Sequence, residues 1–192
     1  MIMVKSRKGF TIIEVVLVLA IAGLIFLMVF VALPALQRSQ RNTQRKRDAE
    51  RFATAIDSYI ANNNKLPFSY GSDSQGRYTV TDRFDTGFVT RYIDSSCTFS
   101  GRTSSSSYGD MYYEYDGCGS EFTDPNGDIY KVIVLNGNGS GYRYTDRIGH
   151  VLFAAGSQCG SDEGIRAANA KPKAYAIFVE LEGGQRYCVD NT

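Results

Sequence analysis

A single apolar run near the N-terminus constrains this 192-residue chain more than any other feature. From Ile12 to Leu33 the sequence has 22 residues, and Glu14 is the only charged one among them. An α-helix rises about 1.5 Å per residue, so the run would be roughly 33 Å long, enough to cross the hydrocarbon layer of a membrane. The chain is therefore expected to start from a helix that lies in lipid or against an equally apolar protein surface.

The residues around this run match a secretory signal peptide only in part. Lys5, Arg7 and Lys8 form a basic start. However, the apolar run is longer than an ordinary signal-peptide core, and no small-residue cleavage site follows it. Pro34 comes directly after the run and is expected to end or kink the helix. A plain signal anchor is the simplest interpretation of these features.

The sequence GFTIIE at Gly9–Glu14 resembles the class III signal of type IV prepilins and type II secretion pseudopilins. In that family a prepilin peptidase cuts after the glycine on the cytoplasmic face and N-methylates the new first residue. The resemblance implies cleavage between Gly9 and Phe10, methylation of Phe10, and a role for Glu14 in assembly. Gly23 matches a helix glycine of many members, whereas Pro34 lies three residues later than the proline of many pilins.

Glu14 is expected to have a partner, because a carboxylate inside a membrane span costs about 2.5–3.5 kcal/mol on insertion scales. Cleavage would create an amine at Phe10, one helical turn away. Between subunits, Glu14 of one copy would neutralise this amine of the next and set the axial register of a filament. Within one subunit, the amine and Glu14 could also meet locally. A further interpretation places Glu14 near the end of the span, where it reaches lipid headgroups. We favour the filament role.

Charge is distributed unevenly along the chain, although the formal net charge is only +1. The residues through Gly9 carry +3, the segment Gln37–Arg51 carries +4, and Phe52–Thr192 carries −5. Three interpretations suit the central segment: a solvated stalk near lipid phosphates, a contact with acidic heads of neighbouring subunits, and DNA binding, in that order. The cations of this basic belt are Arg38, Arg41, Arg45, Lys46, Arg47 and Arg51.

Four cysteines, Cys97, Cys118, Cys159 and Cys188, lie in the C-terminal part, and none belongs to a CxxC pair. Because His150 is the only histidine, a zinc site is disfavoured. Two disulfides in an oxidising compartment are expected instead, which places this part outside the cytoplasm. The positive-inside rule alone would place it inside, since more cations follow the span than precede it. Of the three pairings, we favour Cys97–Cys118 and Cys159–Cys188, because sequential pairing suits a domain built of hairpins.

The pattern predicts an α+β fold with a long N-terminal helix packed on an antiparallel sheet, the layout that the resemblance to pilins also implies. Apolar residues recur at helical spacing from Ala49 to Ile60, and Asn62–Asn64 with Pro67 should end the helix. Hairpin turns are expected at Asn136–Gly139 and Glu182–Gln185. Strands are expected at Arg77–Thr81, Phe88–Ile93, Met111–Tyr115, Ile129–Leu135, Gly141–Thr145, Val151–Ala154, Ala174–Glu182 and Arg186–Val189.

Four segments follow from this pattern. They are a leader over residues 1–9, a transmembrane or filament-core helix over 10–33, a basic stalk with an amphipathic helix over 34–64, and a disulfide-bearing head over 65–192. In the head, Asp124, Asn126 and Asp128 place oxygen ligands at alternate positions, as a calcium loop does. A Pro-Asn-Gly turn explains the same residues, and we favour the turn.

No motif of a nucleophile, a phosphate loop or a dinucleotide site is found, and the single histidine suggests neither an enzyme nor a cofactor. The sequence predicts a structural subunit of a type IV pilus, serving adhesion, motility or DNA uptake. Its partners would be copies of itself, other pilins, prepilin peptidase and the pilus assembly machinery. The precursor would cross the cytoplasmic membrane once, and the assembled chain would lie in a surface pilus. The alternatives are a type II secretion pseudopilin, a minor or tip pilin that binds DNA or a receptor, and a membrane-anchored binding domain that never assembles.

Overall fold

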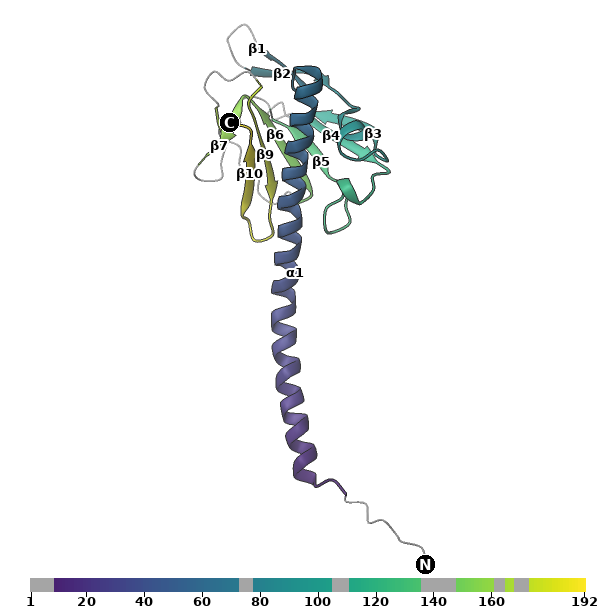
Figure 1. The fold of residues 1–192 in the computed structure, drawn as a ribbon, viewed down its shortest axis with the longest axis vertical. Coiled ribbons are helices and arrows are strands. Elements are labelled where there is room, and N and C mark those ends of the chain that lie inside the picture. The colour runs from purple at the N-terminus through teal and green to yellow at the C-terminus, as the bar shows by residue number, and fades with distance from the viewer. Residues whose placement is uncertain (1–8, 73–77, 105–110, 136–147, 161–164, 168–172) are drawn as a thin grey trace, which may run out of the picture. The chain divides into compact units, whose positions relative to one another are not determined.

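The structure is a computed structural model that describes residues 9–72, 78–104, 111–135, 148–160, 165–167 and 173–192. The chain divides into two compact units, Met1–Gln40 and Arg41–Thr192, and each is described by itself (Figure 1). Helix α1, Ile12–Asn63, contributes to both units. The first unit is the N-terminal part of this helix with the segment before it, and the second unit is the head.

The N-terminal part of α1 exposes large apolar side chains along its length, from Ile12 to Leu33 and on to Leu36. It is long and apolar enough to cross a membrane, and its most apolar stretch has no buried residue. Pro34 lies inside the helix, not at its end. A proline has no N–H to donate, so the helix lacks one backbone hydrogen bond at this point and nevertheless continues.

The C-terminal end of α1 lies where the asparagines predict it. Asn64 has a φ of 57°, and its N–H donates to the carbonyl of Ile60 at 2.8 Å. The Asn63 amide also donates to the carbonyl of Tyr59, at 3.0 Å. Asparagine tolerates the left-handed conformation, and one such residue closes a helix by binding its last carbonyls.

The head is built on a six-stranded sheet in the order β10-β9-β6-β5-β4-β3. All neighbouring strands pair antiparallel except β5 and β6, which run parallel with Lys131 opposite His150. The sheet is therefore mixed, and not wholly antiparallel as expected. Hydrophobic alternation along the strands does not distinguish parallel from antiparallel neighbours. The expected turn Asn136–Gly139 and strand Gly141–Thr145 lie outside the described residues. The strands are β3 (Thr98–Ser104), β4 (Met111–Asp116), β5 (Lys131–Val134), β6 (His150–Ala155), β9 (Tyr175–Glu180) and β10 (Arg186–Asp190).

Smaller elements surround this sheet. Strands β1 (Phe68–Ser72) and β2 (Tyr78–Phe84) form one antiparallel pair, and β7 (Ser157–Cys159) and β8 (Ile165–Ala167) form another. A 3-10 turn, η1, covers Ser120–Phe122.

The strand expected at Phe88–Ile93 is wrong, because Phe88–Tyr92 is a short helix, α2. The carbonyl of Asp85 accepts from the N–H of Phe88 at 2.8 Å, and its carboxylate accepts from the N–H of Gly87 at 3.1 Å. This local turn starts the helix, and the burial of Phe88 and Val89 holds it.

The core of the head lies between one face of the sheet and α1, which crosses the strands in Figure 1. Phe52 and Tyr59 of the helix are buried, with ring centroids 5.6 and 5.7 Å from that of Phe88. Alternate residues of a strand point to opposite faces. Accordingly, Val132 and Val134 belong to this core, whereas the intervening Ile133 belongs to a smaller apolar cluster.

Two disulfides join segments of the head. Cys97, just before β3, bonds to Cys118 after β4, and Cys159 at the end of β7 bonds to Cys188 in β10. This is the sequential pairing that the sequence favours. Gly117 precedes Cys118 with a φ of +69°, a conformation that glycine adopts without strain.

Candidate processing and assembly site

The segment before α1 presents an accessible peptide bond. Gly9, Phe10 and Thr11 are exposed and lie outside the helix, which begins at Ile12. The Phe10 side chain is 90% exposed, and no atom lies within 4 Å of the Cβ position at Gly9. A protease must bind its substrate in a non-helical conformation, so the Gly9–Phe10 bond is positioned where cleavage needs no unfolding of α1.

Thr11 and Glu14 form a capping box at the start of α1. The backbone N–H and the hydroxyl of Thr11 donate to the Glu14 carboxylate at 2.9 and 2.8 Å, and the N–H of Glu14 faces the Thr11 hydroxyl oxygen at 3.4 Å. These bonds satisfy polar groups that the first helical turn would leave unpaired. The sequence predicts an assembly role for Glu14 and not this local one, although the Thr-x-x-Glu spacing indicates it. The carboxylate is thereby held next to the residue that would carry a new amine after cleavage.

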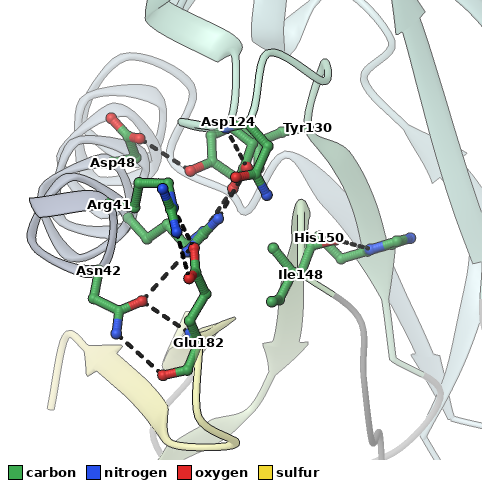
Figure 2. A network of polar contacts seen from close by, with 10 residues as sticks. Arg41, Asn42, Asp48, Asp124, Tyr130, Ile148, His150 and Glu182 are labelled. Carbon is green, nitrogen blue, oxygen red and sulfur yellow. Dashed lines mark hydrogen bonds and ion pairs between the residues drawn. The ribbon is translucent and has the colours of Figure 1, made fainter. Parts of the chain in front are cut away.

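In the head, α1 is fixed to the sheet side by a group of charged and polar side chains that we call the anchor cluster (Figure 2). Its members are Arg41, Asn42, Arg45, Asp124 and Glu182. Arg45 is fully buried and meets Asp124 with two hydrogen bonds, Nε to Oδ2 at 2.7 Å and Nη2 to Oδ1 at 3.1 Å. Both side chains are only 1% exposed. A buried charge must be paired and fully hydrogen-bonded, and this bidentate geometry achieves both.

Glu182 supplies the second carboxylate of the anchor cluster. It accepts from Arg41 at 2.5 and 2.8 Å and from Nη1 of Arg45 at 3.1 Å. Its backbone is also bound, because the amide group of Asn42 accepts from the N–H of Glu182 at 2.9 Å and donates to its carbonyl at 3.2 Å. Gly183 and Gly184 follow with φ values of 98° and 77°, forming the expected turn from β9 to β10. The turn therefore delivers Glu182 to one face of α1.

The anchor cluster shifts the ionisation of its members. The hydrogen bond from Arg41 lowers the pKa of Glu182 to about 2, against the opposing effect of burial and with help from Arg45. Burial opposes the charge of Arg45, yet the hydrogen bonds to Asp124 and Glu182 raise the pKa of this guanidinium. Glu182, Arg41 and Arg45 are therefore charged at neutral pH.

Further polar contacts continue along α1. Tyr130 donates to Asp48 at 3.0 Å, and Asp48 also pairs with Arg51 at 3.4 Å. Tyr187 donates to Glu50 at 2.7 Å, and the ammonium of Lys46 lies 5.3 Å from the Tyr187 ring centroid.

The basic belt thus divides into two cations that bind carboxylates of the head and four cations whose side chains remain exposed. Arg41 and Arg45 bind carboxylates of their own chain, so the expected fully solvated stalk is wrong for this part of the helix. Arg38, Lys46, Arg47 and Arg51 remain exposed. Hydropathy periodicity could not reveal this division, because Asp124 and Glu182 lie 79 and 137 residues beyond Arg45.

The segment for which both a calcium loop and a turn are considered forms the expected turn. The Asp124 carboxylate accepts from the N–H of Asn126 at 2.9 Å, in addition to the two bonds from Arg45. The N–H of Gly127 donates to the carbonyl of Asp124 at 2.8 Å. Both carboxylate oxygens of Asp124 are thus already bound, and no group of three or more His, Cys, Asp or Glu side chains among the described residues is arranged to hold a metal.

Comparison with known proteins identifies the N-terminal segment. The family described as the prokaryotic N-terminal methylation motif matches residues 4–30. Searches of curated proteins and of solved structures return no match to this chain. The match covers the Gly9–Phe10 bond, the capping box and most of the apolar part of α1.

We predict that Arg45→Met destabilises the head by about 3–5 kcal/mol, because the Asp124 charge would stay buried without its partner. The matched control is Arg47→Met, two residues away on the exposed side, which should change the free energy of unfolding by about 0.5 kcal/mol or less. Denaturant unfolding of the full chain in detergent micelles, followed by tyrosine fluorescence, measures both. Equal stability of the two variants would contradict a structural role for the buried pair.

We also predict that acid weakens the wild-type head more than the Glu182→Gln variant. The pKa of Glu182 is about 2 in the folded chain and 4.5 for the ordinary side chain. Its contribution is therefore complete above about pH 5 and is lost as the pH falls toward about 2. Unfolding free energies measured in steps from pH 6 to pH 3 should fall more steeply for the wild type. If the unfolding free energies of the wild type and of Glu182→Gln change with pH in the same way, the ion pairs of Glu182 with its two arginines do not stabilise the head.

Proposed function

We propose that this chain, whose residues 4–30 form the class III signal of type IV pilins and pseudopilins, is the structural subunit of a type IV pilus. Prepilin peptidase cuts it between Gly9 and Phe10 and methylates the new N-terminus at Phe10. The mature chain then leaves the membrane and joins a helical filament whose interior is made of α1 segments. The role is structural and requires neither a catalytic site nor a cofactor.

The observation that carries this proposal is the methylation motif followed by an apolar helix whose large side chains are exposed in the described part of the chain. Phe26, Leu27 and Phe30 are each at least 64% exposed. Burying such a side chain is worth about 1.5–3 kcal/mol, so the segment needs an apolar environment. Lipid supplies it for the membrane-anchored precursor, and equivalent helices of other copies supply it in a filament.

The position of Glu14 supports a role for its carboxylate when the chain passes from the membrane into the filament. In the uncut chain its carboxylate is bound to the N–H and hydroxyl of Thr11. Cleavage adds a positively charged amine at the adjacent residue, and in a bundle of helices the Glu14 of one copy can neutralise the amine of another. An unpaired carboxylate and an unpaired amine are both costly in an apolar interior, so only registers that pair them are stable.

The nearest alternative is a type II secretion pseudopilin, which would carry the same signal and the same helix. A minor or tip pilin that binds DNA or a receptor is a third candidate. DNA binding by the whole basic belt is disfavoured, because Arg41 and Arg45 are engaged by Glu182 and Asp124.

Mass spectrometry of sheared surface filaments tests the proposal directly. The expected N-terminal peptide begins at Phe10 and carries one N-methyl group. Recovery of the chain only from membranes, with Gly9 still joined to Phe10, would contradict both cleavage and assembly. Filaments that appear only when secretion genes are overexpressed, and secretion that fails without this chain, would favour the pseudopilin.

Glu14→Ala should leave membrane insertion and cleavage intact but abolish or greatly reduce filaments, because the Phe10 amine would lack its partner. Immunoblots of membrane fractions measure insertion and processing, and electron microscopy counts filaments. Glu114→Ala, which removes an exposed carboxylate of the head from its pair with Lys131, is the control and should assemble normally. A Glu14→Ala strain with a normal number of filaments would overturn the assigned role.

A further inference from the structure

One face of α1 in the head points away from the anchor cluster, and no element of the described part of the chain covers it. Successive residues turn by 100° around a helix, so Arg47 lies opposite Arg45, and Arg51 lies one turn further on the same side as Arg47. We call this surface the outer helix face. All its side chains are exposed and polar; they are Gln44, Arg47, Arg51, Thr54 and Ser58.

The charge of the outer helix face is positive and only partly compensated. Arg51 has Asp48 at 3.4 Å, whereas Arg47 has no ion pair or hydrogen bond from its side chain within the described part of the chain. The hydroxyls of Thr54 and Ser58 donate back to helix carbonyls, at 2.9 Å each. Arg47 is therefore the main charge of this face without an ion-pair partner among the described residues.

A loop segment of the head carries the complementary charge. In the segment from Asp116 to Asp128, which we call the acidic loop, the carboxylates of Asp116, Glu121 and Asp128 are exposed. None of the three has a side-chain partner among the residues that the structure describes. This distinguishes them from Asp124 of the same loop, which is bound by Arg45.

The acidic loop is held in a fixed conformation. Cys118 ties it to Cys97, and Phe122 anchors it in the core. The N–H of Gly119 donates to the hydroxyl of Ser96 at 2.9 Å, and the N–H of Asp124 donates to the carbonyl of Asp128 at 2.7 Å. A surface fixed in this way can present its carboxylates without losing conformational freedom on contact.

We propose that the outer helix face of one copy, centred on Arg47, docks against the acidic loop of the next copy. The inference rests on the proposed function, which brings many heads close together around a common bundle of α1 helices. Within one chain, no ion pair joins the outer helix face to the acidic loop among the described residues. Each nevertheless carries exposed charges without an ion-pair partner in the described part of the chain. Two different surfaces that pair between identical copies form a head-to-tail contact, and repetition of such a contact produces a helical filament.

Charge also decides between a second copy and a nucleic acid as the occupant. The carboxylates of the acidic loop would repel the phosphates of a nucleic acid. Of the six belt cations, Arg41 and Arg45 are already bound to carboxylates of the head. Exposed ion pairs add little affinity, but opposed charges select the partner surface and set the register. The contact would therefore specify how heads are arranged, while the apolar helices hold the filament together.

The test is a charge reversal with rescue. Arg47→Glu should lower the amount of sheared filaments at least about tenfold, because like charges would then face each other. Introducing Asp116→Lys, Glu121→Lys or Asp128→Lys into that background should restore filaments for at least one of the three positions. Lys65→Glu, a reversal at an exposed residue outside both surfaces, should have no effect. The Arg47→Glu chain must unfold in detergent at the wild-type temperature, which separates assembly from folding.

A zero-length carbodiimide cross-link gives independent evidence. In filaments of the Arg47→Lys variant, the amine at position 47 should couple to Asp116, Glu121 or Asp128 of another copy. Wild-type filament levels for Arg47→Glu, or no such cross-link, would overturn the inference while N-methylated Phe10 in the filaments still supports the proposed function. Loss of filaments without rescue, together with salt-sensitive DNA binding that depends on Arg47, would identify DNA as the partner instead. If the wild-type chain forms no filaments, both proposals fail.

Discussion

The apolar segment from Ile12 to Leu33 needs an apolar environment, and the other features of the molecule can be understood from this requirement. Its side chains are exposed over the whole segment, apart from a partly buried Ala22. A soluble chain with such a surface would aggregate, so the segment needs lipid or copies of itself. Residues 4–30 match the prokaryotic N-terminal methylation motif, and under the proposed function cleavage within this motif precedes the transfer of the segment from lipid to a filament.

The anchor cluster has a different role, which is to attach the charged part of α1 to the folded head. Arg41 is the first residue of the head unit, and with Arg45 it binds two loops of the sheet through Asp124 and Glu182. From Ala49 onward, α1 packs against the head through buried apolar side chains. The helix therefore changes its means of attachment along its length, from ion pairs to hydrophobic packing, and Arg47 stays exposed on the side opposite Arg45.

Local signals in the sequence predicted much of this structure. The apolar run, the asparagines at the end of α1 and the Gly-Gly turn after Glu182 each act through neighbouring residues, and each lies where it was expected. Long-range effects were missed. The run Phe88–Ile93 has strand-like residues, but its burial against Phe52 and Tyr59 and the turn at Asp85 make it helical. The partners of Arg45 could not be predicted, because hydropathy does not show which distant carboxylate will face a cation.

Helical reconstruction of the filament by electron cryomicroscopy tests the central claim most directly, since that claim concerns what covers the apolar segment. The account predicts continuous density for residues 12–33 in the filament interior, packed against the same residues of other copies, with Glu14 of one copy next to the Phe10 amine of another. Filaments that lack this chain, or a chain whose apolar segment is found only in the lipid bilayer, would contradict it.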